Sequence, residues 1–437
     1  MFWFDFAWDI QQLLNHAWWP INFGLLVALV TLGYLAYKKP VYAVGLTIIL
    51  LPTYLFRSNI AGLPVTFLEL DIWTVFCSWL TGTLVRNGFK LPVLPAQLKI
   101  YRWPIILILA GSTVAVFLGP NLFSAAGLWK AYIIEPILFL IVLKNVLTTP
   151  ENKKIILWAL GISTITIAWL AIYQKFSGLG IYTPAWTNPA HRRATSLFSS
   201  PNAVGLYLGP IIAIYIGWMV AEFKQYKATL LKLLIVLPAL VALAFTMSQG
   251  AYLGLAAALI FMAFFGWNKK ITAAVVAVII VVAFILPQLR SAALPMITFT
   301  DASGQNRLTL WNIAATQLTA NPKNFILGLG IGGFAAVQNT LRNPLKLEPL
   351  LYPHNILLNF WTELGLLGLI GFSWVVTVFF QTGFKQLLPT SYFLLPNNWL
   401  QLGVMAAMVT VVVHGLIDVP YFKNDLAVLF WVVVGLL

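Results

Sequence analysis

His354 is the residue whose chemistry first suggests a reaction. A histidine can be neutral near pH 7 and can accept a proton from an attacking hydroxyl group. His354 follows Pro353 and precedes Asn355 at the start of a long apolar segment, 355–381. By spacing alone, an interfacial histidine that only hydrogen-bonds to the backbone is an equal alternative.

A pair of arginines forms a second candidate group. Arg192 and Arg193 precede a helix start that is marked by Ser199, Ser200 and Pro201. Guanidinium groups match phosphate oxygens in a fork geometry, and the N-terminus of a helix also attracts anions. The pair therefore indicates an anion site, although basic residues beside a membrane also bind lipid headgroups.

The region before His354 predicts a helix on the membrane surface. Its apolar residues recur at three- and four-residue steps, as they do on one face of an α-helix. They are Leu308, Trp311, Ala315 and Leu318. Arg307 lies at the start of this amphipathic helix, and Asn321 with Pro322 ends it.

The glycine-rich sequence GLGIGG at 328–333 is similar to a nucleotide-binding loop only superficially. It lacks the GKS or GKT ending of a P-loop, so we exclude that role. We expect it to let the backbone approach a neighbouring helix or an anionic group.

Glu363 is the carboxylate nearest to His354 along the apolar segment. It follows His354 by nine residues, which places the two on opposite faces of a helix. An intramembrane carboxylate usually has a partner. We therefore predict a structural hydrogen-bonding role for Glu363 rather than that of a catalytic acid.

The elements that position these residues follow from composition. Of 437 residues, 60% are hydrophobic and 9% are charged, whereas about a quarter are charged in soluble proteins. A helical span needs about 20 apolar residues. Thirteen segments reach or approach that length: 21–37, 41–56, 66–85, 104–119, 124–143, 155–173, 202–221, 230–246, 250–266, 271–287, 355–381, 398–417 and 426–437. The sequence predicts an all-α polytopic integral membrane protein, with about 12–13 transmembrane helices in a single transmembrane domain, 1–437.

The charges narrow the class of protein further. The net charge is +14, from 26 basic and 12 acidic residues, but no long basic run or separate basic domain exists, which argues against nucleic-acid binding. The only cysteine, Cys77, leaves no disulfide within the chain and no cysteine-ligated metal site. Residues 1–20 lack the basic n-region and the small-residue cleavage site that are typical of a signal peptide. Being rich in tryptophan, they are expected to form an interfacial segment.

Loop charges predict the orientation. Basic residues concentrate in alternate connections, which we assign to the cytoplasm, with the N-terminus outside and the C-terminus inside. Two external connections, 174–201 and 288–354, are nevertheless long and basic, and loops of such length are usually functional or disordered. Their charged residues are Lys175, His191, Arg192 and Arg193 in the first, and Arg290, Arg307, Lys323, Arg342 and Lys346 in the second. The second loop ends at His354.

Taken together, these motifs resemble the signature region of the O-antigen ligase and O-antigen polymerase family. The likeness is good over about 190–437, and the N-terminal spans agree only in hydropathy. It is carried by Arg307, Trp311 and Ala315, then Asn321-Pro322, Gly328 to Gly332, His354-Asn355 and Glu363 to Gly368, with Arg192 to Asn202 and His414 to Asp418 in support.

The resemblance implies an all-helical (GT-C-like) membrane glycosyltransferase in the bacterial cytoplasmic membrane, with its active site on the external face. Such proteins transfer a glycan from an undecaprenyl-diphosphate carrier to a glycan, lipid or protein acceptor, without a cofactor or a metal. His354 would be the essential histidine and Arg307 the loop arginine. Both would be catalytic. The donor diphosphate would be bound by Arg192, Arg193, Arg307 and Gln249, with Trp311, Asn355 and Glu363 in support.

One position departs from the family pattern. Where the family commonly has Ser-Arg-Gly at the opening of a span, this chain has Ser248-Gln249-Gly250. Gln249 donates hydrogen bonds but does not neutralise a phosphate. Either Arg192 or Arg193 compensates for the missing charge, or the donor is held differently.

A transporter or a flippase for lipid-linked oligosaccharides is the main alternative from another class. Lys130 and Glu135 in one span, with Glu69 and Asp71 in another, could form a translocation pathway. A spacing of five does not match the i,i+4 step of an α-helix, and no internal symmetry is found. We therefore predict interfacial or interhelical partners. A purely structural subunit would leave the basic external loops unexplained.

Overall fold

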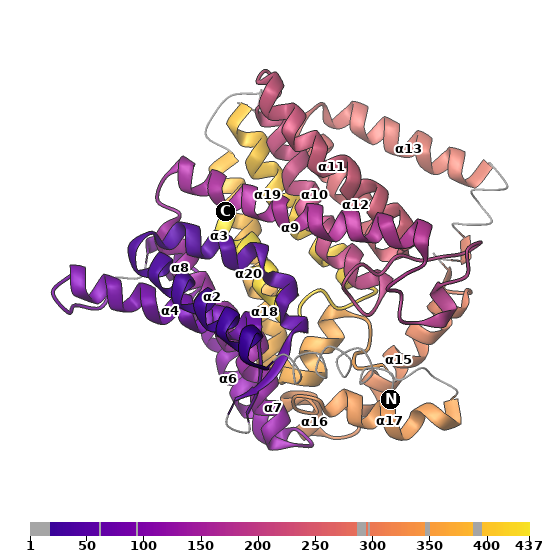
Figure 1. Cartoon of the computed structure of the whole chain (residues 1–437). Coiled ribbons are helices and arrows are strands. Elements are labelled where there is room, and N and C mark those ends of the chain that lie inside the picture. Colours follow the sequence, from indigo (N-terminus) through magenta and orange to yellow (C-terminus); the bar gives the residue numbers. More distant parts are fainter. Residues whose placement is uncertain are drawn as a thin grey trace. The chain divides into compact units, whose positions relative to one another are not determined.

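The computed structural model describes residues 18–60, 63–92, 95–285, 294–295, 298–345, 350–387 and 396–437 (Figure 1). By its packing the chain forms two compact units, which are treated in turn. The first comprises residues 1–99, 130–163 and 423–436, and the second residues 100–129 and 164–422. Most of the predicted interfacial segment 1–20, together with Arg290 and Lys346, lies outside the described residues.

The first unit is mainly helical. It contains α2 (Trp18–Lys38), α3 (Pro40–Ile49), the 3₁₀-helix η1 (Leu51–Leu55), β1 (Arg57–Ile60), β2 (Leu63–Thr66), α4 (Phe67–Arg86), α5 (Ala96–Lys99), the π-helix η2 (Lys130–Ile134), α8 (Glu135–Val146), the first half of α9 (Pro150–Ser177) and α20 (Asn424–Leu436). Its interior lies where α8 packs on α20 and α4 packs on α2.

The second unit holds all the candidate site residues. It contains α6 (Arg102–Leu118), α7 (Leu122–Trp129), the end of α9, η3 (Pro184–Trp186), α10 (Pro201–Ala221), α11 (Tyr226–Thr246), α12 (Gln249–Gly266), α13 (Lys269–Ile285), α15 (Ala302–Thr319), α16 (Pro322–Leu327), α17 (Gly333–Leu345), α18 (Ile356–Leu387) and α19 (Pro396–Gly415). The long connection 288–354 thus carries three described helices, α15 to α17, drawn in orange in Figure 1.

The helices confirm an all-α polytopic membrane protein. Among the described residues, seven helices are long and apolar enough to cross a membrane: Leu122–Val146, Pro150–Ser177, Pro201–Ala221, Tyr226–Thr246, Gln249–Gly266, Ile356–Leu387 and Asn398–Gly415. Shorter apolar helices cover Gly24–Lys38, Pro40–Ile49, Arg102–Leu118 and Asn424–Leu436. Each of the predicted apolar segments overlaps one or more described helices.

The segment 41–56, among the shortest predicted spans, is interrupted. Its helix α3 has ten residues, and Pro52 lies in the first turn of the 3₁₀-helix that follows. Ten helical residues rise about 15 Å, against a hydrocarbon thickness of about 30 Å. An antiparallel hairpin that the sequence did not predict comes next, with Arg57 paired to Thr66.

Glycines let the helices of the second unit approach closely. A Cβ atom on Gly217 of α10 would lie 2.6 Å from the Cα atom of Gly403 in α19. A Cβ atom on Gly111 of α6 would lie 2.9 Å from the nitrogen of Gly368 in α18. Small residues permit such backbone contact between membrane helices. These contacts fix α18 and α19, whose ends carry the candidate site.

In the first unit, three of the four charged residues singled out in the sequence, Lys130, Glu69 and Glu135, contact one another, whereas the buried Asp71 carboxylate has no hydrogen-bond partner among the described residues. Lys130 Nζ lies 2.7 Å from Glu69 Oε2 of α4. Asn424 of α20 donates to the other Glu69 oxygen at 3.0 Å, and the Trp73 indole donates to Glu135 at 2.9 Å. The network joins α4, η2, α8 and α20, so Lys130, Glu69 and Glu135 are interhelical partners, as predicted.

The backbone between Lys130 and Glu135 explains how residues five apart meet. Residues Lys130–Ile134 form a π-helix, in which the hydrogen bond spans five residues instead of four. Lys130 Nζ therefore lies 3.7 Å from Glu135 Oε1. A spacing of five, which does not match an α-helix, thus brings Lys130 and Glu135 together in this π-helical turn, contrary to the expectation from the sequence.

Glu69→Gln should destabilise the first unit, because it leaves the Lys130 ammonium without its nearest counter-ion. The loss of a hydrogen bond between charged groups corresponds to about 1.5–3 kcal/mol, reduced by the partial exposure of Lys130. Thermal unfolding of the detergent-solubilised protein measures the change. The control is Glu151→Gln, at an exposed carboxylate in the first turn of α9. Equal stability of the two variants would contradict the role of the network.

Candidate active site

His354 pairs with an aspartate that follows α19. Its Nδ1 atom lies 3.1 Å from Asp418 Oδ1. His354 has a φ of +51°, a left-handed conformation that costs energy in most residues. The His354 side chain is 23% exposed, while that of Asp418 is 9% exposed. The pair therefore combines an accessible imidazole with a shielded carboxylate.

The surroundings of Asp418 keep it ionised. Burial alone would raise the pKa of Asp418, but the nearby His354 imidazole and the Val419 amide, which donates at 2.8 Å, hold that pKa well below its ordinary value. An ionised Asp418 accepts the Nδ1–H of His354. The Nε2 atom of His354 is then the nitrogen available to take a proton.

Three further side chains attach to the same segment after α19. Arg307 Nε of α15 donates to the Ile417 carbonyl at 2.9 Å. Asn355 Nδ2 donates to the Leu416 carbonyl at 3.0 Å, and the Tyr352 hydroxyl donates to the Phe422 carbonyl at 2.6 Å. The structure thus brings His354, Asn355 and Arg307 together around residues 416–418. These three residues were grouped from the sequence, whereas 416–418 was assigned no chemical role.

Arg193 lies near Arg307, beside the turn between α11 and α12. Arg193 Nε donates to the Thr246 carbonyl at 2.8 Å, and a terminal nitrogen lies 3.3 Å from Asn202 Oδ1. Burial lowers the pKa of Arg193, and the charge of Arg307 lowers it further. The guanidinium groups of Arg193 and Arg307 are therefore close enough for their positive charges to repel each other.

Arg192 lies elsewhere, at the C-terminal end of α9. Its Nη1 atom donates to the carbonyls of Lys175 and Phe176 at 2.8 and 2.9 Å. Its Nε atom donates to the Thr187 carbonyl at 3.1 Å. A cation at a helix C-terminus satisfies carbonyls that the helix leaves without partners. Arg192 therefore links the loop after α9 to the end of that helix. Its side chain has different partners from that of its neighbour Arg193, which binds to Thr246.

Gln249 contacts the helix that carries Arg307. Its Nε2 atom lies 3.4 Å from Asp301 Oδ2. The other oxygen of Asp301 accepts the Gly304 amide at 3.1 Å, which caps the N-terminus of α15. Gln249 therefore links the start of α12 to the start of α15.

The face of α15 differs from the prediction. Of the predicted face, Leu318 is buried, but Leu308 is 40% exposed, and Arg307, Leu310 and Ala314 are buried instead. The predicted face also included Trp311, which is partly buried and meets Phe299 edge to face, and Ala315, which is exposed. The buried face of α15 is therefore displaced by about one residue from the predicted face. Arg307, which was assigned to the polar start of the helix, lies on the buried face and donates to the Ile417 carbonyl.

The GLGIGG loop packs against two helices. Gly328, Gly330 and Gly332 have φ values between +73° and +81°, which favour glycine. The Leu329 amide donates to the Thr362 carbonyl of α18 at 2.7 Å, and the Ile331 amide donates to the Ala115 carbonyl of α6 at 3.1 Å. Of the two expected roles, the contacts match close approach to neighbouring helices.

Glu363 completes the same packing. Its Oε2 atom accepts the Gly332 amide at 2.5 Å, and it forms no pair with His354, whose partner is Asp418. Two residues later Gly365, at φ +70°, breaks the helical path of α18. A Cβ atom there would lie 2.6 Å from the Ile326 carbonyl oxygen. The kink therefore depends on glycine.

Asp418 and His414 are the residues that sequence reasoning did not assign to the site. His414 is buried against α12, where a Cβ atom on Gly250 would lie 2.6 Å from its Nε2 atom. The sequence did contain a signal for these two residues, because a histidine and an aspartate lie four residues apart at the end of an apolar segment. Within the described ranges, no cluster of three His, Cys, Asp or Glu residues could hold a metal ion.

Comparison with known families found a match for part of the chain. Residues 234–373 match the family model described as O-antigen ligase. The match supports glycosyl transfer of the O-antigen ligase or polymerase type. The matched range includes Gln249, Arg307 and His354, while Arg193 and Asp418 lie outside it. No curated protein matches the chain.

Gly365→Ala should destabilise the second unit by about 1–3 kcal/mol, because φ +70° with ψ −170° is a backbone region that residues with a Cβ atom scarcely adopt. The contact with the Ile326 carbonyl adds to it. Thermal unfolding in detergent measures the change. Gly127→Ala, at an exposed helical glycine with nothing within 4 Å, should leave stability unchanged or slightly raise it. A Gly365→Ala protein as stable as this control would show that the kink needs no glycine.

Proposed function

We propose that this chain, which carries an O-antigen ligase domain, transfers a glycan from an undecaprenyl-diphosphate donor to an acceptor hydroxyl. The reaction would take place at the outer face of the bacterial cytoplasmic membrane. The observation that carries the proposal is the His354–Asp418 pair beside Arg307, anchored to one short segment.

In the proposed reaction, His354 is the general base. Its Nε2 atom takes the proton of the acceptor hydroxyl as the acceptor oxygen attacks the anomeric carbon of the donor sugar. The bond between that carbon and the diphosphate oxygen breaks, and the lipid diphosphate leaves with the electron pair. Asp418 keeps the Nδ1 proton in place and stabilises the imidazolium that forms.

The diphosphate would be held by Arg193 and Arg307. Each is fixed by a hydrogen bond from Nε to a backbone carbonyl, to Thr246 and to Ile417. Fixed guanidinium groups stabilise developing negative charge without reorganisation. This assignment also accounts for Gln249, because Arg193 supplies the positive charge that Gln249 lacks. Gln249 then acts through Asp301 and α15 rather than on the diphosphate.

The external orientation follows from the distribution of loop charges. Basic residues in cytoplasmic connections account for most of the net charge, and the site residues belong to the connections assigned to the outside. Membrane lipids would surround the spans. Ligase and polymerase activities share the donor and the chemistry, so the acceptor, whether a lipid, another glycan or a protein, is to be identified by transfer to defined acceptors.

His354→Ala should lower kcat by about 100-fold or more and leave donor binding unchanged, because the general base acts only in the transition state. Asp418→Asn should also lower kcat without raising KM for the donor, since the amide no longer selects the Nδ1 tautomer. Transfer from a purified lipid donor measures both. His191→Ala, at an exposed loop histidine, is the control. Full activity of both His354→Ala and Arg307→Ala would refute the proposed reaction.

Arg193→Gln and Arg192→Gln form a matched pair that tests the diphosphate site. Loss of a charged hydrogen bond of about 1.5–3 kcal/mol should raise KM for the donor about tenfold or more in Arg193→Gln. Arg192→Gln should change the donor KM less than twofold, because its guanidinium is bound to carbonyls at the end of α9. The reverse order of effects would assign the diphosphate to Arg192.

A further inference from the structure

In the first unit, α4 and α8 run in the same direction. Glu69 of α4 pairs with Lys130, just before α8, at 2.7 Å. One turn further along α4, Trp73 donates to Glu135 at the start of α8 at 2.9 Å. Because these contacts follow the same order along both segments, the two helices end on the same side of the unit.

This side of the first unit collects basic residues. Arg86, in the last turn of α4, donates to the Tyr37 carbonyl at 2.9 Å and so joins the end of α4 to the end of α2. The turn 147–149 joins the end of α8 to the start of α9. These helix ends and the residues beside them carry Lys38, Lys39, Arg86, Lys144, Lys153 and Lys154, and Glu151 is the acidic residue described among them.

Lys144 and Lys153 differ from the exposed lysines at other helix ends, because both are half-buried. Lys269 and Lys270 at the start of α13 and Lys385 near the end of α18 are exposed. The ammonium groups of Lys144 and Lys153 are close enough for their positive charges to repel each other. Orientation in the membrane requires basic residues in a connection but not their burial beside one another, so this pair needs a further explanation.

No counter-ion accompanies the two lysines within the described residues. The described ion pairs of the first unit, those of Lys130 with Glu69 and Glu135, lie at the opposite ends of α4 and α8. Asn152 fixes the turn between α8 and α9, because its Nδ2 atom donates to the Val146 carbonyl at 2.7 Å. Ammonium groups that are partly withdrawn from water without a partner are costly. An anion bound between them would offset this cost.

The position of the pair favours the phosphate of a lipid over a free phosphate. The predicted apolar segments of α8 and α9 end and begin beside Lys144 and Lys153, so the ammonium groups lie where these helices leave the hydrocarbon. Ile162 lies two steps of four residues beyond Lys154 on the same face of α9 and is 49% exposed. It offers apolar surface to an acyl chain. Basic groups between membrane helices bind the headgroups of anionic lipids in this way.

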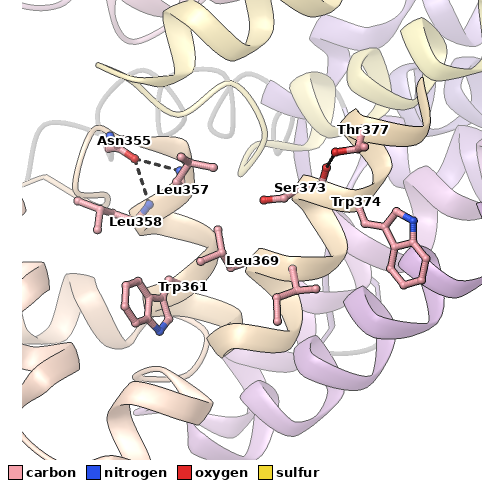
Figure 2. A pocket seen from close by; sticks show the side chains of 9 residues that line it. Asn355, Leu357, Leu358, Trp361, Leu369, Ser373, Trp374 and Thr377 are labelled. Carbon is pink, nitrogen blue, oxygen red and sulfur yellow. Dashed lines mark hydrogen bonds between the residues drawn. The ribbon is translucent and has the colours of Figure 1, made fainter. Parts of the chain in front are cut away.

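The hollow along α18 that Figure 2 shows has no such charge complementarity. Its lining side chains, from Asn355 to Thr377, are all uncharged. The Asn355 Oδ1 atom already accepts the amides of Leu357 and Leu358, each at 3.0 Å. An anionic headgroup therefore finds no cation among these residues, and the lysine pair is the better site for it.

We propose that Lys144 and Lys153 bind the phosphate group of an anionic phospholipid. The neighbouring Lys38, Lys39 and Arg86 raise the positive potential around the pair and favour a headgroup with net negative charge over a zwitterionic one. The loop charges predict that this side of the first unit faces the cytoplasm. The site shares no residue with the proposed reaction and does not depend on it.

The test titrates the delipidated full-length protein in detergent with phosphatidylglycerol and follows thermal unfolding. Phosphatidylglycerol should raise the unfolding temperature of the wild type, and phosphatidylcholine with the same acyl chains should not. Lys144→Gln/Lys153→Gln should lose this gain and bind phosphatidylglycerol about tenfold or more weakly. Without lipid, the same variant should be at least as stable as the wild type, because the repulsion between the ammonium groups is gone. A less stable variant in lipid-free detergent would overturn the inference.

Lys269→Gln/Lys270→Gln is the matched control, because it removes the same charge from two exposed lysines at a helix start. It should keep the wild-type gain with phosphatidylglycerol. An equal loss in both double variants would assign the effect to the net charge of the protein and overturn the inference. Inorganic phosphate that reproduced the full gain would identify a free-anion site, and an equal response to phosphatidylcholine would show that charge is not selected. Either result would also overturn it.

Photolabelling of the wild type gives a measurement that does not depend on the folding of any variant. Phosphatidylglycerol with a photoreactive group near its phosphate should label the segment 144–158. Unlabelled phosphatidylglycerol should displace the label, and phosphatidylcholine should not. Labelling that avoided this segment, or that phosphatidylcholine displaced equally well, would contradict a site built on the two lysines.

Discussion

The hydrogen bond between His354 and Asp418 is the contact on which the rest of the site depends. A charged carboxylate that is only 9% exposed is costly unless it is paired, and here its partner is an imidazole held in a left-handed backbone conformation. The cost is offset by neighbouring bonds to the same segment, from Arg307, Asn355 and Tyr352. The site is thus a set of loops and helix ends attached to residues 416–422, and displacing that segment would displace every group together.

Helix packing determines where that segment lies. Gly217 and Gly403 bring α10 and α19 into backbone contact, and Gly250 leaves room for His414 beside α12. On the other side of the site, Gly111 and Gly368 join α6 to α18. Membrane helices gain little from the hydrophobic effect when they associate, so close packing of small residues carries much of their specificity. The precision of the polar site therefore comes from contacts between glycines at some distance from it.

Three charged residues of the first unit have a structural role. Lys130 forms an ion pair with Glu69 of α4, and a π-helical turn also brings it within 3.7 Å of Glu135. Because these side chains bind to residues of neighbouring helices, they stabilise the packing of the helices and do not form a translocation pathway. This arrangement gives these three charged side chains a role that does not require transport.

The sequence by itself determined the membrane class, the positions of the apolar helices, the helical content of the long connection and the candidacy of His354 and Arg307. These follow from composition and short-range periodicity, which are local properties of the chain. Tertiary structure alone decided that Arg193 rather than Arg192 lies near Arg307, that Asp418 is the partner of His354, that Arg307 is on the buried face of α15, and that Lys130 meets Glu135. Each of these depends on a carbonyl, a carboxylate or a backbone turn brought close by folding, and spacing along the chain does not encode such contacts. Adjacent residues with identical side chains can thus have different partners, because the direction of the backbone at each one is set by its long-range hydrogen bonds.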